Sequence, residues 1–176
     1  VGAVLALGLL LEELGKEALL VLDDPVPRIY CFLDPAGRIR RYDPARDDAA
    51  LAACDAAVVL DVGSLDRVGK VGAALARRRL HTVCIDHHDT NGGFADVNVV
   101  VRGAPSTCSL LLDLVRALGR TPSPAMAAAL LTGLSTDTGW FRFPNTSPAA
   151  LRDAAALREA GADPARIFAR VYEDFS

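Results

Sequence analysis

The stretch TVCIDHHDTN, residues 82–91, joins a short apolar run to a cluster of two aspartates and two histidines. Its apolar part, residues 82–85, is short and bounded by polar residues, which predicts a buried β-strand. Residues 57–60 form a second run of this kind and end in Asp61, and residues 18–22 form a third. These runs alternate with helical patterns. Such alternation is typical of a parallel sheet that is covered by helices on both faces.

Helical periodicity accounts for most of the remaining chain. Proline and charged residues at 25–44 indicate an irregular connection, and residues 97–101 indicate a short extended segment. Helices are predicted at residues 4–14, 66–79, 106–118, 124–134, 147–160 and 164–172, with one helical turn at 49–53. The prediction is therefore one α/β domain over residues 1–176, a parallel sheet flanked by helices with a helix-rich C-terminal half.

Composition limits the class of protein. With 176 residues and 51% hydrophobic side chains, the chain can bury a full core, and 23% charge does not indicate disorder. A net charge of −3 argues against binding of long duplex nucleic acid. The four cysteines form no CxxC pair. We therefore expect each of them to be a small buried hydrophobic side chain in a reducing compartment, and not part of a disulfide framework or a zinc site. No apolar run reaches 18 residues, so we expect no membrane span and a cytoplasmic protein.

Chemically active side chains follow two of the predicted strands. Asp86, His87 and His88 come directly after residues 82–85, and Asp61 follows the preceding strand. Because ligands of open parallel sheets bind outside the carboxyl ends of the strands, we expect these side chains on one rim. Carboxylate and imidazole together suit Mn²⁺, Mg²⁺ or Co²⁺. The alternative is that Asp86 caps a turn and both histidines face solvent.

A further candidate ligand is Asp137, within LSTDTG at residues 134–139. It follows an apolar helix and precedes a glycine, where the chain reverses. Turn chemistry alone would account for an aspartate at such a point. Beside Asp61 and His87, Asp137 is a candidate for a further metal ligand.

Other signals favour structural roles. Residues 77–79, three arginines, fit a solvated helix end better than a phosphate site. Residues 106–107 predict a helix N-cap, although such a helix start could also hold a phosphate. No Walker, GxGxxG or GxSxG motif is present. Three aromatic side chains are predicted to be core rather than a base-stacking platform: Trp140, Phe141 and Phe143.

Asp61, the DHH triplet at 86–88 and the TDTG segment at 136–139 together resemble the DHH phosphoesterase superfamily. The stretches IDHHDTN at 85–91 and STDTGWFRFPNT at 135–146 look like its bacterial oligoribonuclease and pAp-phosphatase branch, the NrnA type. The likeness extends over nearly the whole chain. The triplet alone is weak, whereas its combination with Asp61 and the downstream segment, in this order, is specific.

The resemblance implies a role for each candidate residue. Asp61 would bridge two divalent ions, and His87 and Asp137 would bind one of them. His88 would face the substrate phosphate or the leaving group, so that all four residues are catalytic. The implied ions are Mn²⁺, with Mg²⁺ or Co²⁺ as alternatives. Two such ions can activate water, so that no protein nucleophile is required.

The resemblance also implies a substrate class: short oligoribonucleotides, linear dinucleotides or 3′-phosphoadenosine 5′-phosphate (pAp). Such substrates carry few phosphates, which agrees with the absence of strong positive charge. A DHH-type inorganic pyrophosphatase or polyphosphatase remains an alternative. So does a non-catalytic nucleotide-binding domain. A short RNA or a nucleotide is thus the expected partner, and a homodimer is compatible with the sequence.

Members of this family open with a strand that ends in a histidine and two aspartates, and they carry a smaller C-terminal substrate-binding domain. Here residues 1–3 align just after that first motif, and Val1 lies directly in an apolar helical pattern. We therefore expect residues 1–176 to be a DHH catalytic domain without its first strand and without the substrate-binding domain. On its own this part is expected to be weakly active or inactive.

Overall fold

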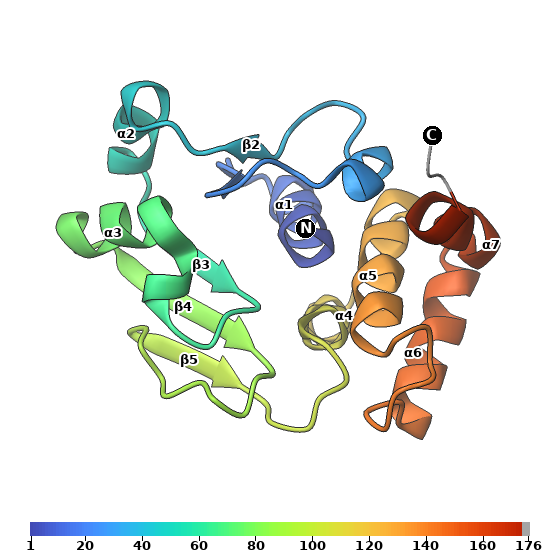
Figure 1. The fold of residues 1–176 in the computed structure, drawn as a ribbon. Coiled ribbons are helices and arrows are strands. Elements are labelled where there is room, and N and C mark those ends of the chain that lie inside the picture. The colour runs from blue at the N-terminus through green and yellow to red at the C-terminus, as the bar shows by residue number, and fades with distance from the viewer. Residues whose placement is uncertain (174–176) are drawn as a thin grey trace.

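Three parallel strands form the larger sheet of the computed structural model, which describes residues 1–173 (Figure 1). Leu60 pairs with Ile85, and Ile85 pairs with Val99, so that the carboxyl ends of the strands meet at one edge. The last three residues of the central strand are buried, as expected of a strand with neighbours on both sides. In order across the sheet, the strands are β3 (Ala56–Leu60), β4 (His81–Asp86) and β5 (Val97–Val100).

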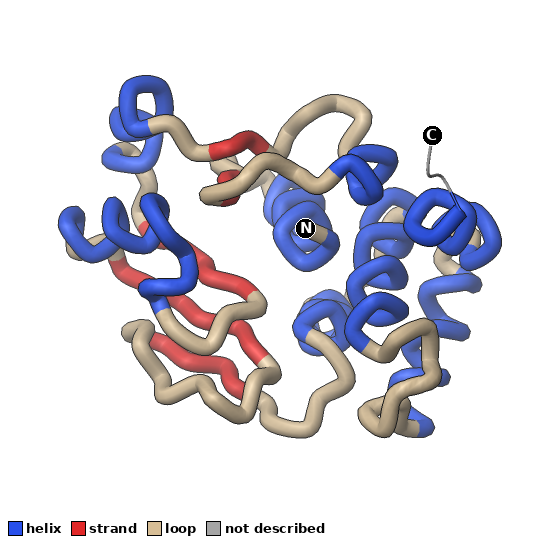
Figure 2. The backbone as a smooth tube through the Cα atoms, viewed as in Figure 1, coloured by secondary structure: helices blue, strands red, loops and turns tan. Residues whose placement is uncertain are grey.

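A second, smaller parallel sheet pairs β1 (Val21–Leu22) with β2 (Arg40–Arg41). Within residues 1–173 it shares no ladder hydrogen bonds with the larger sheet, and Figure 2 shows the two groups of strands apart. β1 is shorter than the predicted strand at 18–22. The connection predicted as irregular also contains β2 and a 3₁₀ helix, η1 (Arg28–Leu33), which the sequence analysis missed.

Three helices enclose the main core: α1 (Gly2–Glu13), α4 (Thr107–Ala117) and α5 (Pro124–Asp137). They approach closely because glycines lie at their contacts. A Cβ atom on Gly2 would overlap the carbonyl oxygen of Ala129, and one on Gly133 would overlap Sγ of Cys108. Apolar side chains of all three helices fill the space between them, among them Leu10, Leu111 and Leu130.

A smaller core covers the opposite face of the larger sheet. Val59 of β3 packs there with Val71 and Leu75 of α3 (Gly69–Arg78). The predicted helix at 66–79 is in fact two segments, because Gly69 adopts a positive φ of 61° after a 3₁₀ turn. The other elements of this part of the chain are α2 (Pro44–Ala52) and η2 (Leu65–Val68).

The chain is helical from α4 onward, which confirms the predicted helix-rich C-terminal half, and α6 and α7 pack against α5 (Figure 1). After α4 and α5 this half contains α6 (Pro148–Glu159), α7 (Pro164–Phe168) and a π-helical segment, η3 (Ala169–Glu173). None of the helices in the described part of the chain combines the length and apolar character needed to span a membrane. Parallel sheets flanked by helices confirm the predicted fold class.

Two burial predictions are corrected. Cys84 and Cys108 are buried as expected, but Cys31 is exposed and Cys54 only half-buried. Cys31 lies on η1, a short helix that contributes no buried residue to the core. Phe143 is 52% exposed, unlike Trp140 and Phe141, which pack against the main core.

Candidate metal centre

Asp61 is held at the carboxyl end of β3 from two sides. Its backbone N–H donates to the carbonyl of Ile85 at 3.1 Å, which extends the ladder with β4. Its carboxylate Oδ1 accepts a hydrogen bond of 2.8 Å from Oγ1 of Thr107, in the first turn of α4. The backbone of Asp61 is left-handed, with φ 63°, a conformation that costs a non-glycine residue about 1–2 kcal/mol. The strained turn coincides with the residue predicted to hold metal, as is common at functional sites.

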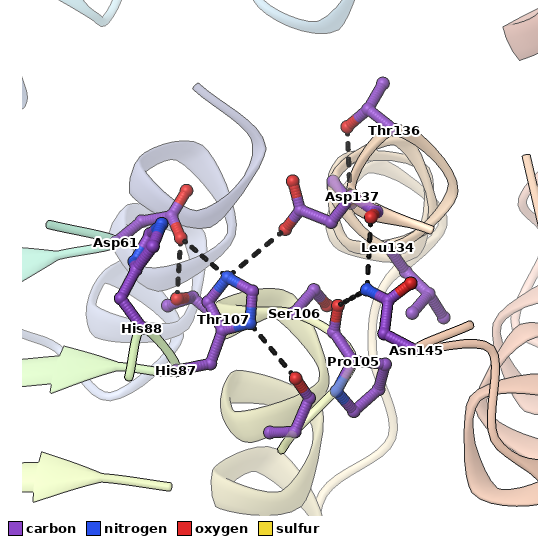
Figure 3. Close-up of polar contacts among 12 residues, drawn as sticks. Asp61, His87, His88, Pro105, Ser106, Thr107, Leu134, Thr136, Asp137 and Asn145 are labelled. Atoms are coloured by element: carbon purple, nitrogen blue, oxygen red, sulfur yellow. Dashed lines mark hydrogen bonds and ion pairs between the residues drawn. The ribbon is translucent and has the colours of Figure 1, made fainter. Parts of the chain in front are cut away.

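His87 presents one ring nitrogen to the rim. Its Nδ1 lies 3.0 Å from the carbonyl oxygen of Ala104, which can only accept, so Nδ1 carries the proton. Its Nε2 lies 3.6 Å from Oδ1 of Asp61 and 4.0 Å from Oδ2 of Asp137 (Figure 3). In the neutral imidazole, Nε2 therefore offers its lone pair toward both carboxylates. A backbone carbonyl on the far nitrogen is a common support of metal-binding histidines.

Asp137 reaches the same point from the helical half of the molecule. It is the last residue of α5, which runs three residues beyond the predicted end at 134. Partial burial raises the pKa of Asp137 to about 6, and the nearby negative charge of Asp61 adds to the effect. Two carboxylates directed at one imidazole nitrogen repel each other, and a divalent cation between them would remove that repulsion.

Asp86, the last residue of β4, is fully buried and hydrogen-bonds to the ring of His88. Its two oxygens lie 2.7 Å from Nδ2 of Asn91 and 2.7 Å from Nδ1 of His88. Burial alone would raise the pKa of Asp86, but the hydrogen bonds from Asn91 and His88 outweigh it and lower that pKa. The same hydrogen bond to Asp86 raises the pKa of His88.

The donor atoms have the spacing that a divalent ion requires. Nε2 of His87 lies 3.6 Å from Asp61 and 4.0 Å from Asp137. His88 also has a ligand atom within 4.8 Å of Asp61 and His87, but its hydrogen bond to Asp86 favours the positive imidazole, which is a poor metal ligand. Donors bound at about 2.1 Å in octahedral geometry lie roughly 3–4 Å from one another. Carboxylate oxygens suit Mn²⁺ and Mg²⁺, and the group contains no thiolate of the kind that soft metals prefer. The residues present therefore fit such an ion.

The structure brings together all four predicted site residues, from the ends of β3, β4 and α5. His88 is 43% exposed, but His87 only 16%, so His87 does not face solvent as the alternative assumed. Sequence reasoning missed the supports. The N-cap predicted at residues 106–107 is confirmed at Ser106, which accepts from the N–H of Ser109, whereas the support that Thr107 gives to Asp61 was not predicted.

Asn91 and Asn145 lie in the two stretches that resemble the DHH phosphoesterases, but nothing in the sequence indicated what their side chains bind. Asn91 is buried in the loop after β4, where its amide contacts Asp86 and the carbonyl of Val62. Asn145 follows α5 and donates to the backbone of Asp137. Both are single polar residues in turns, so that only the meeting of distant segments shows what they bind.

Known proteins resemble this chain in sequence and in fold. The family model described as DHH family, N-terminal domain, matches residues 1–134, which include Asp61, His87 and His88 but not Asp137. The bifunctional oligoribonuclease and PAP phosphatase NrnA of Thermus thermophilus is 34% identical over 97% of this chain and 49% of its own length. The uncharacterized protein MG371 of Mycoplasma genitalium is 29% identical over 66% of this chain and 35% of its own.

A solved structure supports the fold. An exopolyphosphatase-related protein from Bacteroides fragilis superposes with a TM-score of 0.93 at 23% identity, over all of this chain and 53% of that one. The chain thus spans about half the length of that protein and of the Thermus relative. From the match over residues 1–134 we conclude that the chain belongs to the DHH family.

Proposed function

We propose that the chain is the catalytic part of a metal-dependent phosphoester hydrolase whose substrates are short oligoribonucleotides, linear dinucleotides or pAp. The observation that carries the proposal is the convergence of Asp61 and Asp137 on Nε2 of His87, at 3.6 and 4.0 Å. Family membership supports the reaction class. The Thermus relative, named as an oligoribonuclease and PAP phosphatase, supports the substrate class.

In this proposal Asp61, His87 and Asp137 would together hold one divalent ion, and Asp61 would also be a ligand of a second. The proposed ion is Mn²⁺, with Mg²⁺ or Co²⁺ as alternatives. When bound, such ions neutralise charge on phosphoryl oxygens and lower the pKa of water toward about 7. The chain's own residues contribute by holding the ligand side chains in position. Ala104 fixes the tautomer of His87, and Thr107 holds the carboxylate of Asp61 toward the same point.

His88 is proposed to contact the substrate phosphate or the leaving group. Its ring lies beside that of His87, with centroids 4.7 Å apart, and is 43% exposed at the rim. Nδ1 hydrogen-bonds to Asp86, so Nε2 is the ring nitrogen proposed to contact the phosphate or the leaving group. The buried carboxylate also stabilises a positive imidazole, which would attract a phosphate.

A small substrate fits the charge of the chain. With a net charge of −3 it lacks the broad basic surface of proteins that bind long duplexes. We therefore propose a short RNA or a nucleotide as the partner of this site.

The test compares substrates on the protein in its full natural length, with Mn²⁺. We expect hydrolysis of the dinucleotide pApA and of pAp at least about tenfold faster than that of pyrophosphate or tripolyphosphate. Faster hydrolysis of the inorganic substrates would favour the pyrophosphatase alternative. Nucleotide binding without hydrolysis would favour a binding domain.

The Asp61→Ala variant tests the site itself. It should abolish hydrolysis of every substrate while the far-UV circular dichroism spectrum stays that of the wild type. The matched control is Asp113→Ala, which removes an exposed carboxylate on α4 and should leave activity unchanged. Activity retained by Asp61→Ala would contradict the proposed bridging role.

A further inference from the structure

Asn145 joins two segments that carry different parts of the candidate metal centre. It lies in the loop between α5 and α6, and its Nδ2 donates to two backbone carbonyls. One belongs to Asp137, at 3.1 Å, and the other to Pro105, also at 3.1 Å (Figure 3). Both hydrogens of a single amide are therefore used.

The orientation of this amide follows from its partners. Both partners are carbonyl oxygens, which only accept hydrogen bonds, so the nitrogen must face them. The other end of the amide, Oδ1 of Asn145, is buried, and no described residue hydrogen-bonds to it. A buried carbonyl without a partner costs free energy. Whatever Asn145 contributes to the structure therefore comes from its two N–H donors and not from Oδ1.

The two bonded segments are those that fix the ligands. Pro105 lies next to Ala104, which holds His87, and two residues before Thr107, which holds Asp61. On the other side, Asp137 is itself a candidate ligand. Asn145 thus links the segment that holds His87 and Asp61 to the backbone of the third candidate ligand, Asp137.

The chain must reverse sharply to bring residue 145 back to the end of α5. Gly139, Trp140 and Phe141 form three consecutive left-handed residues, with φ of 55°, 59° and 62°. The N–H of Trp140 donates to Ser135, and the N–H of Phe143 donates to Thr138. This turn directs the following residues toward Pro105.

We propose that Asn145 is a positioning residue, which holds Asp137 at ligand distance from His87 and Asp61. The inference rests on the proposed function, because it takes these three residues as metal ligands. Among residues 1–173, the hydrogen bonds of Asn145 go to backbone carbonyls and not to a ligand side chain. Its effect is on the separation of the two segments and so on the strength of metal binding.

The test measures Mn²⁺ affinity by calorimetry, and the electron paramagnetic resonance spectrum of bound Mn²⁺, in the protein at its full natural length. Asn145→Ala removes both donors, and Asn145→Asp keeps the shape but donates to neither carbonyl. Loss of an outer support typically weakens metal binding by about 10–100-fold, and we expect this for both variants. The electron paramagnetic resonance spectrum of bound Mn²⁺ should also change, because Asp137 would no longer be held in place. Should Asn145→Asp fail to fold, Asn145→Ala alone decides.

Thr146→Val is the matched control. It replaces a neighbouring buried hydroxyl that, among residues 1–173, also has no partner. Its Mn²⁺ affinity and spectrum should equal those of the wild type.

Each other outcome overturns one idea. If Asn145→Ala melts at a lower temperature without metal but binds Mn²⁺ as the wild type does, Asn145 is merely structural and the proposal fails. If the wild type binds no Mn²⁺, the proposed metal site fails, and the positioning role fails with it.

Discussion

At the scale of the residue, His87 and His88 are adjacent in the chain, yet their surroundings prepare them for different chemistry. Nδ1 of His87 meets the neutral carbonyl of Ala104, whereas Nδ1 of His88 meets the buried carboxylate of Asp86. The carboxylate raises the pKa of His88 and so favours its positive form. A positive imidazole attracts phosphate and is a poor metal ligand, while a neutral one with a free lone pair is a good ligand.

His88→Ala should therefore reduce turnover more than metal affinity. We expect kcat to fall at least about 100-fold, within the usual range for a proton-transferring or charge-stabilising side chain, and the Kd for Mn²⁺ to change little. Steady-state kinetics and calorimetry on the same preparation measure both. The control is His81→Ala, the third histidine, which is exposed and paired with Asp96. Equal losses of turnover and affinity would make His88 a ligand.

The sequence could predict the four site residues because strand ends and the family likeness mark them. It could not predict Asn91, Thr107 or Asn145. Their roles depend on which carbonyl or carboxylate another segment brings within 3.1 Å. Such contacts depend on how distant segments pack together, and this packing produces no periodic pattern in the sequence.

At the scale of the element, α4 and α5 determine the distance between the two sides of the site. α4 supplies Thr107 and α5 supplies Asp137, and the two helices touch where Gly133 faces Cys108. The absence of a side chain at Gly133 sets how near they come. The spacing of the ligands therefore depends on a residue that belongs to the core.

Gly133→Ala should push α4 away from α5. An added methyl group in a packed core typically costs about 1–3 kcal/mol, and here it would overlap Sγ of Cys108. Thermal unfolding should show a lower Tm, and Mn²⁺ affinity should fall with it. Gly92→Ala is the control, since its Cβ would meet open space. A Tm equal to that of the wild type would show that the helices absorb the methyl group without moving apart.

Helix α2 gives the protein a sensitivity to acid. Hydrogen bonds from Arg46 and from the N–H of Asp43 lower the pKa of Asp47 to about 2. Folding therefore favours the charged form, so the stabilisation is complete above the ordinary pKa near 4 and is lost as pH falls through 2. Chemical unfolding at pH 2–7 should show Asp47→Asn less stable than the wild type, with the difference closing in acid. A difference that is independent of pH would contradict this account.

The elements themselves were predicted unevenly, for physical reasons. β3, β4 and β5 match within one residue because each is a short apolar run between polar ends. The burial predicted for β3 is only partly correct, since Val59 is buried but Val58 is exposed. α2 was predicted only as the turn at 49–53, since its first half is polar and starts from a proline. β2 consists of two exposed arginines, which no pattern distinguishes from a loop.

At the scale of the whole molecule, the site lies where an α/β half meets a helical half. Asp61 and His87 belong to the sheet, Asp137 belongs to the helical half, and α4 contacts both β4 and α5 (Figure 1). A cation held by all three side chains would therefore connect the halves. Metal binding should stabilise the whole fold and not only the rim.

Mn²⁺ should raise the Tm of the protein, and EDTA should reverse the rise. Free ligand at about 100 times its Kd adds about 2.7 kcal/mol to the free energy of unfolding. In a domain of about this size, 1 kcal/mol corresponds to roughly 2–4 °C, so we expect an increase of about 5–11 °C by calorimetry. Asp61→Ala should show no such increase. An equal increase in that variant would place the bound ion elsewhere.

The larger sheet has one more consequence, for the handling of the protein. Within residues 1–173, β5 pairs with β4 alone, and three valines at or just after it are 44–45% exposed: Val97, Val99 and Val101. An apolar strand with an unpaired edge can pair with a strand of another molecule, and at high protein concentration such pairing leads to aggregation and loss of solubility. Surface engineering for storage or crystal growth should therefore begin with a charged side chain on this strand.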